Sequence, residues 1–253
     1  MIVNSFCVNS FWYGSPLTKL GNLCINSFLA NGFDFHLWSY SNKITVPKGC
    51  VIRDASEILD SSLIFMSKTK SFAPFSDWFR FTLLHKHGGT WVDMDMVCLN
   101  PFSIEPNTIC EEQRGRIAMG IIDLEKGHPM AKNLIDAYEN PSLQTDYDTE
   151  SRIKFKKSIS HLPVKEQRKV APWGFLGNDL LRLVRKRYEF NELNINDFYP
   201  VSYNDGKKIY TGEINYEEIK NAKCIHMWGE LTRRIRPKVS DESIMKKLIT
   251  LYT

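Results

Sequence analysis

Two carboxylates, Asp93 and Asp95, are the residues of this sequence best suited to chemistry. They follow an apolar segment typical of a strand, in which alternate side chains point to the same side. Both carboxylates would then face one cation, and two hard oxygen ligands suit Mg²⁺ or Mn²⁺ better than zinc. A solvated pair at a strand end has the same spacing, so the motif is weak on its own. The neighbouring sequence is therefore needed to distinguish a metal site from a surface turn.

Two further polar pairs lie on predicted helices. Asp77 and Arg80 are three residues apart in a helix expected over 74–87, so they share one face as a matched acceptor and donor. The same spacing also suits a surface salt bridge. Asn178 and Asp179 follow a glycine-containing segment, where they could either reach a sugar or simply cap the helix that begins there.

The elements before the carboxylates alternate between strand and helix patterns. The order strand, helix, strand is a βαβ unit, which predicts an α/β fold with a mainly parallel sheet and a ligand site at the carboxyl ends of the strands. A buried helix and the Gly88-Gly89 turn lead directly into the strand that carries Asp93. The first strand is not followed by G-x-G-x-x-G, so the dinucleotide-binding fingerprint is absent. The predicted elements are a strand at 1–8, a helix over 17–28, a strand at 33–40, a short helix at 54–59, a helix over 74–87 and a strand running from 90 through 99.

The second half of the chain is harder to interpret. Residues 141–170 are rich in charge and predict a loop-rich excursion or mobile subdomain. Arg233, Arg234, Arg236 and Lys238 precede an amphipathic helix with Ser240 as its expected N-cap. These cations either contact an anionic membrane surface or are solvated while the helix packs on the domain. The other predicted elements are a strand at 116–122, helices at 128–138, 180–188 and 217–222, and a strand at 224–228.

Composition limits the classes of protein that remain. With 253 residues, 43% hydrophobic and 25% charged, the chain is long enough for one large domain and has an ordinary globular composition. The 33 basic and 29 acidic residues give a net charge of +4, which does not indicate nucleic acid as a partner. The amino terminus lacks the pattern of a secretory signal and no apolar run reaches about 20 residues, so we expect a cytoplasmic protein. The six scattered cysteines predict reduced core thiols; a zinc site built from distant members is the alternative.

The stretch from Phe75 to Asp95 resembles the S-D-x-x-R and L-x-x-x-G-G-x-x-x-D-x-D core of the DXD-containing sugar transferases. That superfamily includes glycosyltransferase family 32, the α-1,4-galactosyltransferase-like enzymes and the catalytic domains of large clostridial toxins. Phe11-Trp12-Tyr13-Gly14 resembles the family's W-x-G loop, and His226-Met227-Trp228 its closing strand and loop. The resemblance covers residues 1 to about 130 and 224–230, and it is thin between them.

This resemblance implies a GT-A-like fold, a mixed, mainly parallel sheet flanked by helices. It also implies a nucleotide-sugar donor, dependence on Mn²⁺ or Mg²⁺, and transfer with retention of anomeric configuration. Carried over residue by residue, Ser76, Asp77 and Arg80 would bind the donor sugar, and Asp93 the ribose, the sugar or the metal. Asp95 would bind the metal with His226, Trp12 would stack on the base, and Trp228 would contact the β-phosphate. Asn178 and Asp179 lie where the resemblance is thin; from their place at a helix start they could reach the donor sugar or acceptor. From the residues alone, Trp12 fits a core aromatic equally well, and His226 fits either a metal site or a satisfied core histidine.

We therefore expect a single domain at 1–253. A nucleotide-sugar-binding core would occupy 1–130, an acceptor-side excursion 141–222, and a closing strand with a basic helix 223–253. The expected activity is transfer of a hexose or N-acetylhexosamine from a UDP-linked donor to a glycan or lipid-linked glycan, as in surface polysaccharide synthesis, with peripheral contact at the inner face of the membrane. Alternatives are a metal-dependent phosphoryl-transfer enzyme, for which Glu105, Glu111 and Glu112 are the only nearby downstream acids, and a sugar-binding protein without turnover.

Overall fold

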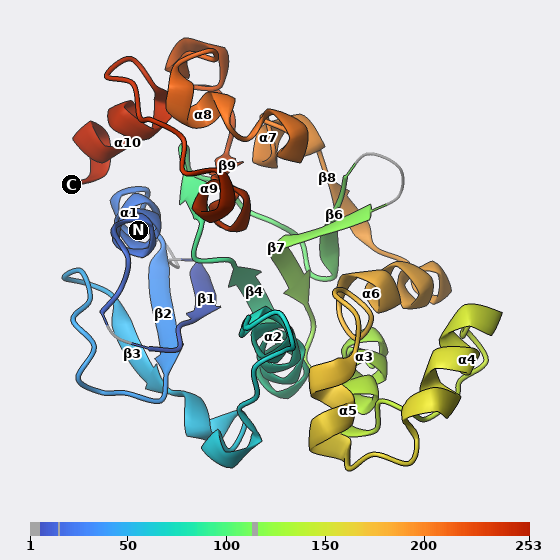
Figure 1. Cartoon of the computed structure of the whole chain (residues 1–253). Helices are drawn as coiled ribbons and strands as arrows, with labels where there is room; N and C mark the ends of the chain where they lie inside the picture. The colour runs from blue at the N-terminus through green and yellow to red at the C-terminus, as the bar shows by residue number, and fades with distance from the viewer. Residues whose placement is uncertain (1–5, 15, 113–115) are drawn as a thin grey trace.

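A mixed β-sheet forms the centre of the structure, a computed structural model that describes residues 6–14, 16–112 and 116–253 (Figure 1). Within these residues, seven strands lie in the order β3-β2-β1-β4-β7-β6-β8, and β5 pairs with β9 in a separate ribbon. Parallel pairing joins β1 to β2 and β4, β2 to β3, and β6 to β8, whereas β7 is antiparallel to β4 and β6. The mixed, mainly parallel sheet expected from the sequence is confirmed. The strands are β1 (Cys7–Phe11), β2 (Asp34–Ser39), β3 (Val51–Asp54), β4 (Gly89–Val92), β5 (Met96–Cys98), β6 (Thr108–Glu112), β7 (Arg116–Leu124), β8 (Asn191–Leu193) and β9 (Cys224–His226).

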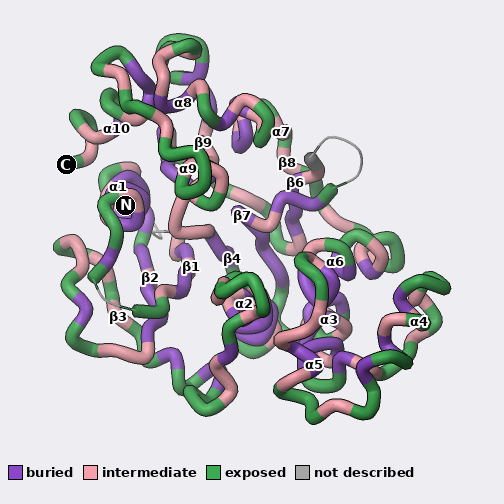
Figure 2. The backbone as a smooth tube through the Cα atoms, in the orientation of Figure 1, coloured by how far each residue is buried: buried purple, intermediate pink, exposed green. Residues whose placement is uncertain are grey.

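Helices cover both faces of the sheet, and the central strands β4 and β7 are largely buried (Figure 2). Neighbouring residues of β4, Trp91 and Val92, enter different hydrophobic cores, because successive side chains of a strand point to opposite faces. One core contains α1 and α10, and the other contains α2, α3 and α6. The helices are α1 (Lys19–Ala30), α2 (Ala73–His87), α3 (Pro129–Glu139), α4 (Glu150–Ile159), α5 (Val164–Val170), α6 (Asn178–Val184), α7 (Ile195–Phe198), α8 (Lys208–Thr211), α9 (Gly229–Ile235) and α10 (Ile244–Tyr252).

The junction between α2 and β4 fixes the approach to the carboxylates. Pro74 lies in the first turn of α2, where its missing N–H costs nothing, and Gly88 ends the helix with a φ of 72°. A Cβ atom at Gly88 would lie 2.7 Å from the backbone nitrogen of Lys126, so only glycine fits there. The helix that the sequence predicted over 74–87 is confirmed, and the chain enters β4 directly from it.

The expected strand from 90 through 99 is wrong at its centre. β4 ends at Val92, and a turn closed by a hydrogen bond from the Met96 nitrogen to the Asp93 oxygen (3.0 Å) separates it from β5. β5 then leaves the main sheet and pairs antiparallel with β9. Asp93 and Asp95 therefore stand on a turn, not on one face of a strand. The cause is the pairing with β9, which lies about 130 residues further along the chain and leaves no local signal.

Several other boundaries differ from expectation. The first strand begins at Cys7, and residues 1–5 of the expected strand lie outside the described residues. The expected short helices at 54–59 and 217–222 are single 3₁₀ turns, and the helix at 180–188 is α6 followed by another such turn. The side chain that caps α10 is Ser243, which accepts from the Lys246 nitrogen, and not Ser240. β8, α7 and α8 were not predicted, because they are too short for a periodic pattern.

The excursion at 141–170 is more regular than expected, since α4 and α5 occupy much of it. An ion cluster anchors α4: the Asp148 carboxylate accepts from Arg152 Nε (3.1 Å), Lys156 Nζ (2.6 Å) and the Thr145 hydroxyl (2.9 Å). The Asp148 side chain is fully buried, and both cationic side chains are nearly so. The cluster therefore holds the excursion to the domain as a folded part of it.

Replacing Asp148 by Asn should lower the free energy of unfolding by about 3 kcal/mol, because two buried cations lose their shared carboxylate. The matched control is Asp146→Asn, whose exposed pair with Arg187 should contribute nothing measurable to the melting temperature. Chemical denaturation of both variants measures the difference. Equal free energies of unfolding for Asp148→Asn and the wild type would show that the cluster does not anchor α4.

Candidate functional site

Asp93, Asp95 and His226 converge on one point at the end of β4. Their potential ligand atoms all lie within 4.8 Å of one another, and within the described residues this is the one group of three such side chains able to hold a metal ion. Asp93 and Asp95 come from the turn after β4. His226 comes from the end of β9, where it pairs with Met96 of β5. The two carboxylates and the histidine predicted for the metal are thus brought together, although by a turn and a distant strand.

Asp95 is held on both of its oxygens. His226 Nε2 lies 3.0 Å from Oδ1, and the Gly229 backbone N–H donates to Oδ2 at 2.8 Å. Burial opposes the charge of this carboxyl, but His226 and the Gly229 N–H outweigh it and lower the pKa below its usual value. Asp95 is therefore an ionised carboxylate of fixed orientation at neutral pH.

Asp93 is oriented by two donors. Arg80 Nη2 and the Trp91 indole N–H both bond its Oδ1, the latter at 2.7 Å, and the Arg80 guanidinium lies 4.9 Å from the centre of the Trp91 ring. Trp91 was not singled out from the sequence; its position two residues before Asp93 in a strand was the only available signal. Because Oδ1 is engaged in this way, Oδ2 is the oxygen more readily available to a ligand.

Asp77 and Arg80 form a buried pair, so a surface salt bridge is excluded. Arg80 Nη1 lies 3.2 Å from Asp77 Oδ1, and the residues are only 3% and 7% exposed. Burial raises the pKa of Asp77 to about 6 despite the guanidinium, whereas Asp93 and Asp77 raise the pKa of Arg80 against the effect of its own burial. A Cβ atom at Gly177 would approach Asp77 Oδ2 to 2.5 Å, so the segment before α6 packs directly on this carboxylate.

The two candidate nucleotide-binding tryptophans lie at the core that contains α1 and α10: Trp228 is part of it and Trp12 packs against it. Trp12 is half-buried in the loop after β1, and Trp228 is 8% exposed with its indole N–H donating to the Val201 oxygen at 3.0 Å. Trp228 also has a φ of 51°, a strained value for a bulky residue, and its ring centre lies 4.1 Å from that of His226. Trp228 thus packs against His226 of the candidate metal site, but its N–H is already engaged. Ser76, half-buried on α2, adjoins Asp77.

Asn178 and Asp179 begin α6, but neither caps it. The N-cap position is Gly177, without a side-chain hydrogen bond, so the capping alternative is wrong. Asn178 Nδ2 donates to the Ile117 oxygen at 3.2 Å, which ties α6 to β7, and Asp179 is exposed. Asn178 therefore connects the site to the sheet, whereas Asp179 faces solvent.

Other acids and the cysteines lie outside this group. Glu111 pairs with Arg185 at 3.2 Å, and among the described side chains Glu105 and Glu111 do not join Asp93 and Asp95. The Glu112 side chain lies outside the described part. The six cysteines are reduced thiols, four of them buried, as expected, and the group of Asp93, Asp95 and His226 contains none of them. In the described part of the chain, no helix is long and apolar enough to cross a membrane.

Two family models match the chain. The glycosyltransferase sugar-binding region containing the DXD motif matches residues 21–115, and the α-1,4-glycosyltransferase conserved region matches residues 178–252. The first covers α2, β4 and both aspartates, and the second covers α6 and His226. The two matches therefore contain most of the residues that the geometry brings together.

Solved structures of glycosyltransferases resemble this chain at low identity. The PaToxG glycosyltransferase is 13% identical with a TM-score of 0.46 over 72% of this chain and 67% of its own. Two structures of the glycosyltransferase GlyE of Streptococcus pneumoniae TIGR4, one an apo form, are each 10% identical with a TM-score of 0.45 over 88% of this chain. The matched parts span about half of the GlyE chains, 54% and 55%. Among curated proteins, none matches. From the two family models and the motif residues that they contain, the chain is a glycosyltransferase of the DXD-containing superfamily.

Proposed function

We propose that this glycosyltransferase binds a nucleotide diphosphate sugar through a divalent cation held by Asp93, Asp95 and His226. It would transfer a hexose or N-acetylhexosamine, with retention of configuration, to a glycan or lipid-linked glycan. The observation that carries the proposal is the convergence of two carboxylates and one imidazole at the end of a buried strand. The donor-binding core, the acceptor-side excursion and the closing segment remain the division proposed above, at 1–130, 141–222 and 223–253.

The donor set fits Mn²⁺ or Mg²⁺. Carboxylate oxygens dominate it and no thiolate takes part, which disfavours a structural zinc site. His226 Nε2 and Asp95 Oδ1 are 3.0 Å apart, about the separation of neighbouring ligands in an octahedron with bonds of about 2.1 Å. A cation bound there would neutralise the charge that develops on the departing diphosphate.

The chain's own residues would then position the sugar. Arg80 lies between Asp77 and Asp93, so it holds both carboxylates at fixed positions and directs them to donor hydroxyls. Asp93 Oδ1 is bonded by two donors, which leaves Oδ2 for the ribose, the sugar or the cation. In this proposal no side chain serves as a general base, because the leaving phosphate accepts the proton of the acceptor hydroxyl.

A donor screen tests the proposal against its rivals. UDP-glucose, UDP-galactose, UDP-N-acetylglucosamine and GDP-mannose are incubated with the protein and Mn²⁺, and release of nucleoside diphosphate is followed. A glycosyltransferase releases nucleoside diphosphate from one of these donors, and the release stops with EDTA. Release of inorganic phosphate from nucleotides would favour phosphoryl transfer, and tight donor binding without release would favour the sugar-binding alternative.

Contact with anionic membranes is a further proposal, favoured by the segment 233–239. Arg233 and Arg234 both pair with Glu230, whereas Ile235 and Val239 are exposed beside the remaining cations. α10 buries Ile244 and Leu248 in the core with α1, so this helix packs on the domain, which was one of the two alternatives. Any membrane contact would therefore use the segment before α10.

Vesicles of phosphatidylglycerol should bind the protein weakly at low salt and release it at high salt. Each unpaired cation near such a surface contributes about 1 kcal/mol, and salt screens that contribution. The measurement is co-sedimentation of the wild type and of a variant with Arg233, Arg234, Arg236 and Lys238 replaced by Gln. Equal partitioning of the two proteins would reject the membrane proposal and leave the transferase proposal unaffected.

A further inference from the structure

The turn at residues 172–177, between α5 and α6, presents an unusually exposed tryptophan. Trp173 is 59% exposed, the largest exposed fraction among the large apolar side chains described. Gly174 shapes the turn with a φ of 76°, and a Cβ atom there would lie 2.9 Å from Asp179 Oδ2. A single exposed tryptophan is not by itself a site. In addition to Trp173, the turn borders two cavities.

A small cavity on one side reaches Asp77. Trp173, Asp77, Tyr138 and Arg168 line it, and its volume of about 10 Å³ has room for about one water molecule. The Tyr138 hydroxyl is fully buried and has no hydrogen-bond partner among the described residues. Because a buried hydroxyl without a partner is costly, this group is suited to receive a ligand or a water molecule that bridges to one. Asp77, which lines this cavity together with Trp173, pairs with Arg80, and Arg80 pairs in turn with Asp93.

A larger cavity lies on the other side of the turn. Its volume is about 380 Å³, within the range of small-ligand sites. Phe155 and Phe175 supply apolar wall, while Ser151, Asp179 and Arg182 supply hydroxyl, carboxylate and guanidinium groups. Donor and acceptor groups beside apolar side chains suit the hydroxyls and C–H faces of a sugar.

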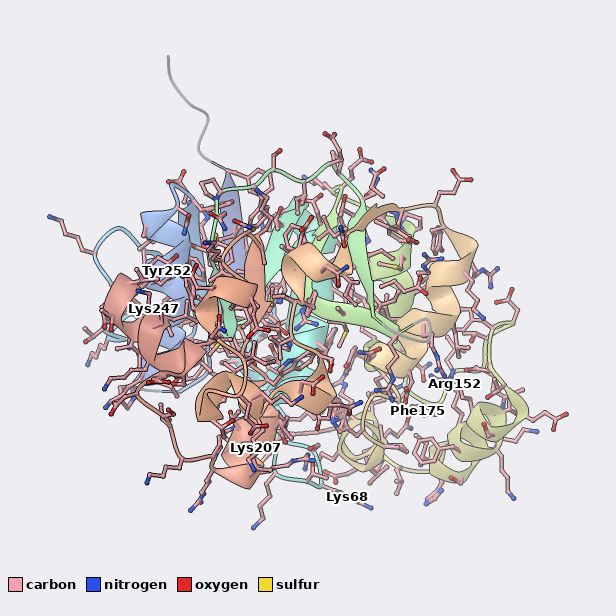
Figure 3. The ribbon with its side chains drawn as sticks, turned by 90° about the horizontal axis from the view of Figure 1, so that it is seen from above. Lys68, Arg152, Phe175, Lys207, Lys247 and Tyr252 are labelled. Atoms are coloured by element: carbon pink, nitrogen blue, oxygen red, sulfur yellow. The ribbon has the colours of Figure 1, made fainter. Side chains whose placement is uncertain are left out.

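The walls of this cavity are held in place. The Arg152 guanidinium lies 3.8 Å from the centre of the Phe175 ring and donates to the Phe175 oxygen at 2.9 Å, and the two residues lie together in Figure 3. Arg152 also bonds Asp148, so the ion cluster of α4 fixes the turn before α6. A site that is already ordered loses less entropy when it binds a flexible glycan.

We propose that residues 172–177 form the acceptor platform, which takes an acceptor glycan of at least two pyranose sugars. The sugar nearest the reaction would stack its C–H face on the Trp173 indole, whose electron-rich face attracts polarised C–H groups. The next sugar would occupy the larger cavity and bond Asp179 and Arg182. This inference rests on the proposed function, since the small cavity reaches Asp77, which that proposal assigns to the donor sugar.

The test follows the indole N–H signals of the six tryptophans by NMR. The Trp173 signal is assigned by its loss in Trp173→Tyr. The probes are the methyl glycosides of glucose, galactose and N-acetylglucosamine, and the disaccharides cellobiose, lactose and maltose. We expect the Trp173 signal to move with at least one sugar, and the disaccharide to bind about tenfold more tightly than the matching monosaccharide.

Variants separate stacking from the second subsite. Trp173→Ala should weaken sugar binding about tenfold, the upper range for one aromatic contact, and Trp173→Tyr should retain most of it. Arg182→Gln should remove the preference for disaccharides and keep the Trp173 shift. Leu251→Ala is the control, because Leu251 is also exposed but lies on α10, on the opposite side of the molecule from Arg152 and Phe175 (Figure 3).

The outcomes distinguish this inference from the proposed function. If no sugar moves the Trp173 signal, or if Trp173→Ala binds sugars as tightly as the wild type, the platform is wrong even when UDP binds with Mn²⁺. If sugars bind at Trp173 but no nucleotide binds, the platform stands as a glycan site and the proposed donor chemistry fails. Loss of binding in Leu251→Ala as well would indicate general unfolding and would also reject the assignment.

Discussion

Replacing Asp95 by Asn is expected to abolish Mn²⁺-dependent binding of UDP while the protein stays folded. The Asn oxygen can still accept from the Gly229 N–H, so the turn keeps its shape, but the cation loses a negatively charged ligand. Loss of a residue that only orients a metal ligand typically costs 10–100-fold in affinity, so loss of a ligand charge should cost about a hundredfold or more. Calorimetric titration of UDP with and without Mn²⁺ measures this change.

Asp136→Asn is the matched control, because Asp136 is an exposed carboxylate on α3 that pairs only with Lys132 among the interactions described. It should bind UDP as the wild type does. Unchanged UDP affinity in a folded Asp95→Asn protein would remove Asp95 from the metal site. A melting temperature lowered far below that of Asp136→Asn would instead assign Asp95 a structural role.

Replacing Arg80 by Lys is expected to slow transfer about a hundredfold and to change UDP affinity little. Lysine keeps the positive charge that the buried Asp77 needs, but a single ammonium cannot hold Asp77 and Asp93 together as the guanidinium fork does. A positioned donor of this kind typically contributes about a hundredfold or more to turnover. The measurement compares turnover with inhibition by the product UDP.

Substitution by lysine separates catalysis from folding better than substitution by alanine. Arg80→Ala would leave Asp77 buried and unpaired, at a cost of about 3–5 kcal/mol of folding free energy, and a loss of activity would then have two causes. Arg187→Lys, in an exposed pair with Asp146, is the control for the change of residue type. Equal losses of turnover and of UDP affinity in Arg80→Lys would place Arg80 at the nucleotide or in the scaffold only.

The sequence predicted those parts of the fold whose signals are local. The helix over 74–87 has its proline start, apolar face and glycine stop within fifteen residues, and α1 (Lys19–Ala30) contains most of the helix expected over 17–28. The boundary between β4 and β5 could not be predicted in this way, because β5 is defined by its pairing with β9. Local periodicity therefore extended one strand through Asp93 and Asp95 where the chain turns.

For the candidate site too, local signals could be predicted from the sequence and tertiary contacts could not. Asp77, Arg80 and Asp93 were grouped by motif, and the structure joins them by ion pairs to the buried Arg80 side chain. Tyr138 and Trp173 were missed, since a tyrosine late in a helix and a tryptophan in a loop carry no pattern. Their place beside Asp77 depends on how the turn before α6 packs on α2 and α3, which is a tertiary contact.

Cation binding by Asp93, Asp95 and His226 is tested most directly by a crystal structure of the protein with Mn²⁺ and UDP, using the anomalous signal of manganese. We expect one manganese peak bounded by Asp93, Asp95 and His226, with the diphosphate on its open side, and no such peak in Asp95→Asn crystals. Bound UDP with the manganese peak at other residues, or with no peak at this group, would show that these three residues do not hold the cation.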